Sequence, residues 1–193
     1  LPQLGQLYGT WGYELINWIE PTVPVYASME SDPPDGVWMF MDRILIFDQV
    51  KRLITAVAYG DLTIEKSAEN AYQSALNEIE KLKSLMTAPL PNLEPLSWNF
   101  NKDNIPLTKK NCTKAAFKAS VDSAKHFIEK GDIFQLVLSQ KIEATVTHKP
   151  FDLYRSLRMV NPSPFMAFFD FGDWQLIGSS PEVMVKAEPM EDG

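Results

Sequence analysis

The chain has 193 residues, of which 45% are hydrophobic and 11% aromatic, and its formal net charge is −7. This composition excludes a disordered chain and supports a sizeable core. Since the balance is acidic and no local basic patch stands out, the sequence also argues against a nucleic-acid surface.

A single cysteine, Cys112, excludes an internal disulfide and fits a reducing compartment. One Cys and two His argue against a structural zinc site. No apolar run reaches the roughly 18 residues that a membrane span needs, and no signal peptide is visible. We therefore expect a cytoplasmic protein without a membrane segment, or a plastid protein if the source is plant-like. The start at Leu1 and the turn-rich end at Gly193 indicate a fragment of a longer protein.

In the N-terminal region, Gly9 and Gly12 stand among aromatic residues, which indicates a bulge or a close approach of two backbones. Their spacing is too common to indicate a nucleotide-binding loop. Residues 37–47 and 53–58 are rich in β-branched and aromatic residues and predict two strands with a short connection. Residues 65–86 carry one apolar stripe at helical spacing and predict an amphipathic helix.

Residues 89–110 contain several prolines and show no periodic pattern of apolar residues, which predicts a linker. We therefore divide the chain into an N-terminal region, 1–88, the linker 89–110, and a second region, 111–193. A helix is predicted over 112–130, and Gly131 follows it as a C-cap glycine would.

Residues 133–143 are apolar and β-leaning and predict a buried strand. Gln135 places an amide in this run, and a buried amide needs hydrogen-bond partners. Two interpretations stay open: the amide binds a neighbouring backbone group and fixes the core, or it faces a polar cavity and touches a ligand.

Pro150 opens a predicted short helix, in whose first turn a proline is tolerated. A proline-rich turn then leads into a predicted hairpin with strands over 165–171 and 174–178, and residues 183–185 predict a further strand. Glu182 lies between Pro181 and that last strand. A partly desolvated carboxyl has a raised pKa and can act as an acid or base, but a solvated glutamate at a strand edge is the alternative.

Residues 117–182 resemble component I of anthranilate synthase, a member of the chorismate-utilising enzyme family. Three separated motifs, in the right order and spacing, carry the resemblance: 131–139 after its helix, 161–166, and 178–182. The resemblance implies an α+β fold of large, mostly antiparallel sheets in a two-sheet sandwich, with helices packed outside. It also implies that residues 1–88 belong to a regulatory region.

The resemblance implies conversion of chorismate and ammonia to anthranilate and pyruvate, with Mg²⁺ as cofactor and ammonia supplied by a glutamine amidotransferase partner. Glu182 would be the acid/base beside the departing C4 hydroxyl, and Ser180 would lie near the substrate. Relatives that add water carry a lysine where this chain has Gln135. An amide has no basic nitrogen, so Gln135 cannot deprotonate water but could hold ammonia, which is already a nucleophile. The metal ligands are expected beyond Gly193, with none in this chain.

The turn at 161–166 matches the family's feedback site, so tryptophan would contact Asn161, Pro164, Phe165 and Met166. A proline-locked turn that presents an aromatic ring and a thioether suits an indole. A structural turn whose Phe165 and Met166 belong to the core is the alternative.

Two rival functions stay open at this point. Aminodeoxychorismate synthase component I would share Gln135 and Glu182 but keep the pyruvyl group of chorismate. A non-catalytic fragment that senses tryptophan or serves as a scaffold would bind a ligand without turnover. As a fragment, the chain alone is expected to be inactive.

Overall fold

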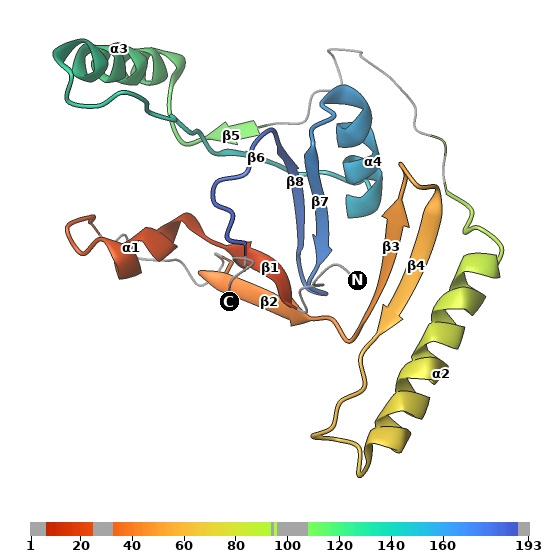
Figure 1. Cartoon of the computed structure of the whole chain (residues 1–193). Coiled ribbons are helices and arrows are strands. Elements are labelled where there is room, and N and C mark those ends of the chain that lie inside the picture. Colours follow the sequence, from red (N-terminus) through yellow and green to blue (C-terminus); the bar gives the residue numbers. More distant parts are fainter. Residues whose placement is uncertain (1–6, 25–32, 94, 96–107, 189–193) are drawn as a thin grey trace. The chain divides into compact units, whose positions relative to one another are not determined.

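The computed structural model describes residues 7–24, 33–93, 95 and 108–188. The chain divides into two compact units, Leu1–Leu93 and Glu94–Gly193. Helices and strands are mixed, and every sheet in the described part is an antiparallel pair, which confirms the α+β prediction (Figure 1). These sheets are small, because each has two strands. The predicted linker lies mostly outside the described residues, and the predicted domain boundaries stay a prediction.

The first unit begins with a strand pair in which two backbones approach closely. Strand β1 (Leu7–Trp11) pairs with β2 (Gly36–Phe40), and Gly9 lies opposite Trp38. A β-carbon built on Gly9 would lie 2.0 Å from the carbonyl oxygen of Val37, so no side chain fits there. The predicted close approach is confirmed. Two short helical segments, η1 (Tyr13–Leu15) and α1 (Ile16–Ile19), follow β1.

The predicted strand over 37–47 is in fact two strands. It breaks between β2 and β3 (Arg43–Asp48), and β3 pairs with β4 (Leu53–Ala58) as the second predicted strand. The break arises because β2 and β3 have different partners, β1 and β4, and each follows its own sheet. Sequence composition alone does not reveal a change of partner.

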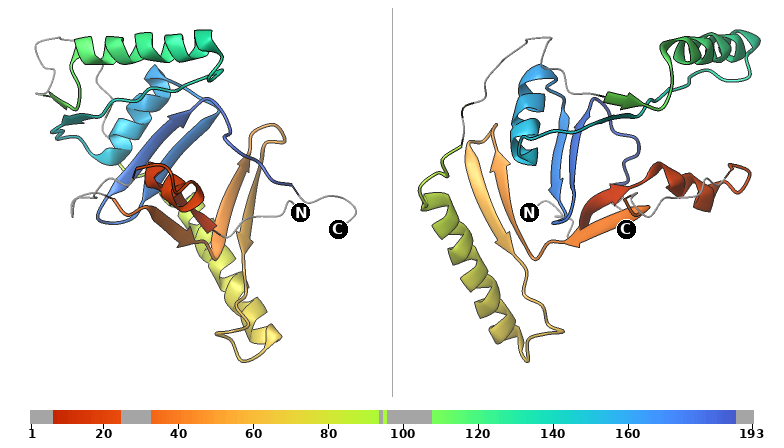
Figure 2. Two further views of the ribbon diagram at one scale, coloured as in Figure 1. Left: turned by 90° about the vertical axis from the view of Figure 1, so that its left-hand side faces the viewer. Right: turned by 180° about the vertical axis from the view of Figure 1, so that it is seen from behind.

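Helix α2 (Ala68–Thr87) packs along the β3–β4 hairpin, which Figure 2 shows from two further sides. It begins three residues later than predicted, because Ser67 caps it by accepting the backbone N–H of Asn70 at 3.2 Å. Ala71 and Leu82, both on the predicted apolar stripe, are the buried hydrophobic residues of the described chain. The stripe therefore faces the hairpin as an amphipathic helix requires.

The second unit begins with a short strand and a helix. Strand β5 (Thr108–Lys110) precedes α3 (Lys114–Lys130), which Thr113 caps through the backbone N–H of Ala116 at 3.1 Å. Gly131 ends the helix with φ of +81°, a conformation that favours glycine, so the predicted C-cap is confirmed. No helix of the described residues is both long and apolar enough to span a bilayer.

The strand predicted over 133–143 is wrong for most of its length. Residues 132–141 are irregular, and only β6 (Ile142–Ala144) forms, paired with β5. The side chains of Phe134 and Val137 are 92% and 83% exposed. A strand needs a neighbour for its backbone hydrogen bonds, and within the described residues no strand pairs with 132–141. The strand predicted over 183–185 is absent for the same reason.

The last three elements follow the prediction closely. Helix α4 (Pro150–Val160) starts with its proline and packs on the hairpin of β7 (Phe165–Asp170) and β8 (Gln175–Ser180). The rings of Phe151 and Tyr154 on α4 lie 5.4 and 5.6 Å from the ring of Phe168 on β7. These aromatic contacts fix α4 against one face of the hairpin.

Candidate functional site

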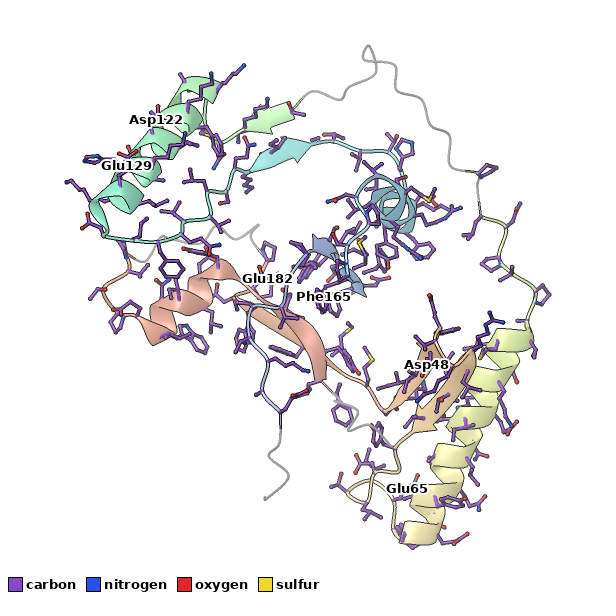
Figure 3. The ribbon with its side chains drawn as sticks, turned by 45° about the horizontal axis from the view of Figure 1, so that its top comes forward. Asp48, Glu65, Asp122, Glu129, Phe165 and Glu182 are labelled. Atoms are coloured by element: carbon purple, nitrogen blue, oxygen red, sulfur yellow. The ribbon has the colours of Figure 1, made fainter. Side chains whose placement is uncertain are left out.

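The open end of the β7–β8 hairpin brings two of the predicted motifs together. In the antiparallel register, Phe165 lies opposite Ser180 and Met166 opposite Ser179. The turn that ends in Phe165 is thus side by side with the segment that leads to Glu182. Figure 3 shows these two labelled side chains at the same end of the hairpin.

Ser179 ties the turn to β8 through its hydroxyl. Its Oγ lies 2.8 Å from the carbonyl oxygen of Asn161, the C-cap residue of α4, and 2.9 Å from the Oγ of Ser163. These bonds join residues 16 to 18 positions apart in the sequence. They hold the proline turn, whose residues are largely exposed, against the last residues of β8.

Glu182 is exposed, so the expected desolvation of its carboxyl is not found. The physical reason is that the strand predicted after it does not form, which leaves the residue on an open segment. The Ser180 hydroxyl donates to the backbone carbonyl of Glu182 at 3.1 Å and restrains the short connection between them. Its carboxylate has no hydrogen bond or ion pair with any described residue, so both oxygens are accessible to a ligand.

Phe165 and Met166 lie on opposite faces of β7, because successive side chains of a strand alternate. Met166 shares its face with Phe168, against which α4 packs, and it is half-buried. Phe165 shares the other face with Ser180 and is 48% exposed. Of the predicted tryptophan contacts, Phe165, Pro164 and Asn161 are therefore exposed, whereas Met166 points to the helix side.

Gln135 lies in the irregular segment 132–141 and is exposed. The prediction that its amide is buried in a strand is therefore wrong. It has no hydrogen bond to any residue of the described part, and no strand pairing joins its segment to the hairpin. The structure thus brings Glu182, Ser180 and the 161–166 turn together and does not join Gln135 to them.

The end of the hairpin loop is held by a second small network. Asp170 accepts the backbone N–H of Gly172 and the Nε2 amide of Gln175, both at 3.0 Å. These bonds favour the ionised carboxylate, so the Gln175 amide first and the Gly172 N–H second hold the pKa of Asp170 below its ordinary value. Gly172 has φ of +88° and permits the turn. This network sets the register on which the opposite end of the hairpin depends.

The described residues do not offer a metal site. Nowhere in the described ranges do three or more His, Cys, Asp or Glu side chains gather in a way that could hold a metal ion.

Sequence reasoning missed the roles of Ser163 and Ser179. Both lie inside the motifs, but a serine in a turn and one near a strand end carry no signal of their own. The register of the predicted hairpin places Met166, not Ser163, opposite Ser179. The hydroxyl contact between Ser163 and Ser179 depends on how the turn folds back onto β8, so the strand pairing alone does not reveal it.

An exposed carboxylate beside a proline-locked aromatic turn, on a hairpin covered by one helix, is the site that this fold defines. The chain belongs to the chorismate binding enzyme family, whose model matches residues 1–192.

Several relatives within this family are components of anthranilate synthase. The chain is 49% identical to anthranilate synthase component 1 of Synechocystis sp. over 197 residues, which cover 100% of the chain and 39% of that protein. It is 36% identical to anthranilate synthase component 1 of Acetivibrio thermocellus, over 95% of the chain and 37% of that protein. The crystal structure of anthranilate synthase component I from Streptococcus pneumoniae matches with a TM-score of 0.71 and 32% identity, over 94% of this chain and 40% of that one. The chain thus spans about two fifths of the length of these relatives.

Proposed function

We propose that this chain is part of the chorismate-binding subunit of anthranilate synthase. The observation that carries the proposal is the hairpin register, which holds the Ser180–Glu182 segment beside the 161–166 turn in a chain of this family. The full-length protein would convert chorismate and ammonia to anthranilate and pyruvate, the first step of tryptophan biosynthesis.

Glu182 is the proposed acid/base at the C4 hydroxyl of chorismate. A hydroxide is a poor leaving group, and a carboxylic acid placed beside it lowers the barrier by donating a proton as the bond breaks. The carboxylate of Glu182 is exposed and without partners, so it is free to approach a substrate. Ser180, whose hydroxyl holds the Glu182 backbone, lies next to the substrate in this proposal.

Gln135 is the proposed contact of the incoming ammonia. Its amide oxygen can accept a hydrogen bond from ammonia and leave the nitrogen lone pair available for attack on the substrate. The exposed position of Gln135 leaves this amide without competing partners in the described chain. Ammonia would come from glutamine through an amidotransferase subunit, and we place the complex in the cytoplasm.

Tryptophan is the proposed feedback inhibitor, bound at the 161–166 turn. Phe165 offers a half-exposed ring for an indole, and the prolines on either side of Ser163 limit the freedom of the backbone that presents it. Asn161 and Pro164 are exposed beside it and are the further proposed contacts, with Met166 reaching the ligand from the helix side.

The test uses the full-length protein as its source organism makes it, supplied with chorismate, ammonium ions and Mg²⁺. Anthranilate is followed by its fluorescence and pyruvate by a coupled enzyme. We expect equal amounts of the two products. An aminated product without pyruvate would support the aminodeoxychorismate alternative and overturn the proposal. Binding of tryptophan without any turnover would overturn it in favour of a non-catalytic protein.

A further inference from the structure

The hydroxyl of Ser179 is the side-chain link between the turn at 161–166 and the segment that carries Glu182. On one side it contacts the carbonyl oxygen of Asn161 at 2.8 Å and the hydroxyl of Ser163 at 2.9 Å. On the other side, Ser180 follows directly in the chain and binds the Glu182 backbone at 3.1 Å. The proposed effector turn therefore contacts Ser179, which lies three positions before the proposed acid/base, Glu182.

The direction of the protons in this network follows from its chemistry. A hydroxyl carries one proton, and a carbonyl oxygen can only accept. Ser179 therefore donates to Asn161, and its own oxygen accepts the proton of Ser163. Each of the two bonds polarises the other, so that a displacement of Ser163 changes the bond that holds β8 to the end of α4.

We propose that Ser179 is a positioning residue that couples occupancy of the 161–166 turn to the placement of Glu182. The inference rests on the proposed function. A ligand that moves the turn must move Ser163 or Asn161, and through Ser179 it shifts the end of β8. The hydrogen bond from the Ser180 hydroxyl to the Glu182 carbonyl restrains the connection between these residues. A displacement of the end of β8 is therefore transmitted to the Glu182 carboxylate.

The coupling has a measurable size. Coupling between two sites changes affinities by about 5- to 150-fold, and each ligand changes the affinity of the other by the same factor. The factor is the ratio of the chorismate dissociation constants with and without tryptophan. It can be measured by calorimetry on the full-length protein without an amine source, when no amination can occur.

Ser179→Ala removes the hydroxyl, and we expect the ratio to fall to within about threefold of one, below the usual range for coupled sites. Tryptophan should still bind, because Phe165 and Pro164 are intact. Ser179→Thr keeps a hydroxyl at the same position and should restore a ratio close to that of the unaltered protein. If Ser179→Ala only damaged the local structure, Ser179→Thr would not restore the ratio of the two chorismate dissociation constants.

Ser156→Ala is the matched control. Ser156 also lies in this unit, is half-buried, and donates to a backbone carbonyl, that of Asp152 at 2.9 Å, but within its own helix. We expect it to leave the ratio unchanged. An unchanged ratio in Ser179→Ala, with both ligands bound, would overturn the inference and leave the proposed function standing. If the unaltered protein bound neither chorismate nor tryptophan, the proposed function would fail, and the inference would fail with it.

Discussion

Phe165 lies directly opposite Ser180 in the antiparallel register of β7 and β8. Ser180 in turn lies two residues before Glu182 in the chain. The two side chains share the face of the hairpin that points away from α4. A slip of one residue would turn Phe165 towards the helix and separate the aromatic ring from the Ser180–Glu182 segment. The register of one hairpin therefore decides which residues the candidate site contains.

Replacing the proposed acid/base should abolish most of the turnover. Glu182→Gln keeps the size of the side chain but cannot donate or accept the catalytic proton, and we expect ammonia-dependent turnover to fall by roughly 100-fold or more. The rate of anthranilate formation in the full-length protein measures it. Glu129→Gln, a change at an exposed glutamate of α3, should have no effect. Undiminished turnover in Glu182→Gln would exclude this role.

The identity of residue 135 should influence whether ammonia or water attacks the substrate. Gln135→Lys replaces a neutral amide with a base of the kind that the water-adding relatives carry. We expect anthranilate formation to fall by about tenfold or more, as for loss of a positioned polar group, and hydroxylated product to increase. Mass spectrometry of the products measures both. Gln140→Lys, in the same exposed segment, is the control, and an equal loss in both variants would count against a specific role.

The close approach at Gly9 should make this position intolerant of a side chain. A β-carbon there would lie 2.0 Å from the carbonyl oxygen of Val37, which is backbone and cannot rotate away. We expect Gly9→Ala to reduce the free energy of unfolding by about 1–3 kcal/mol, as overpacking does. Gly178→Ala is the comparison, because its β-carbon would meet that of Ala167 at an ordinary 3.6 Å. Urea unfolding followed by circular dichroism should show the larger loss for Gly9→Ala.

Acid should weaken the β7–β8 hairpin through Asp170. Hydrogen bonds from Gln175 and from the Gly172 N–H lower the pKa of this carboxyl from its ordinary 3.8 in the folded chain. A group whose folded pKa is lowered stabilises the fold above the unfolded value, and this contribution is lost as the pH falls through the folded one. Unfolding measured between pH 5 and about pH 2 should therefore show a loss of stability below 3.8.

Asp170→Asn should remove that part of the pH dependence, because the amide does not titrate. Asp173→Asn, in the same exposed loop, is the control, since Asp173 makes no hydrogen bond within the described residues. The account of the loop is wrong if the two variants show the same pH dependence.

The sequence by itself determined the local elements that end with clear chemical signals. Gly131 and Pro150 mark helix ends, and alternating or periodic apolar residues predict α2, α4 and the β7–β8 hairpin. These features depend on neighbours within a few positions, so they can be read without the fold. The family motifs could be recognised for the same reason, since each is a short continuous stretch.

The tertiary structure alone decided which strands find partners. Residues 132–141 and 183–185 have the composition of strands but no neighbour to pair with in the described part of the chain, so Gln135 and Glu182 are exposed rather than buried. It also decided the link from Ser179 to the 161–166 turn. Strand pairing and hydrogen bonds between distant residues depend on three-dimensional partners, and composition at one position does not encode them.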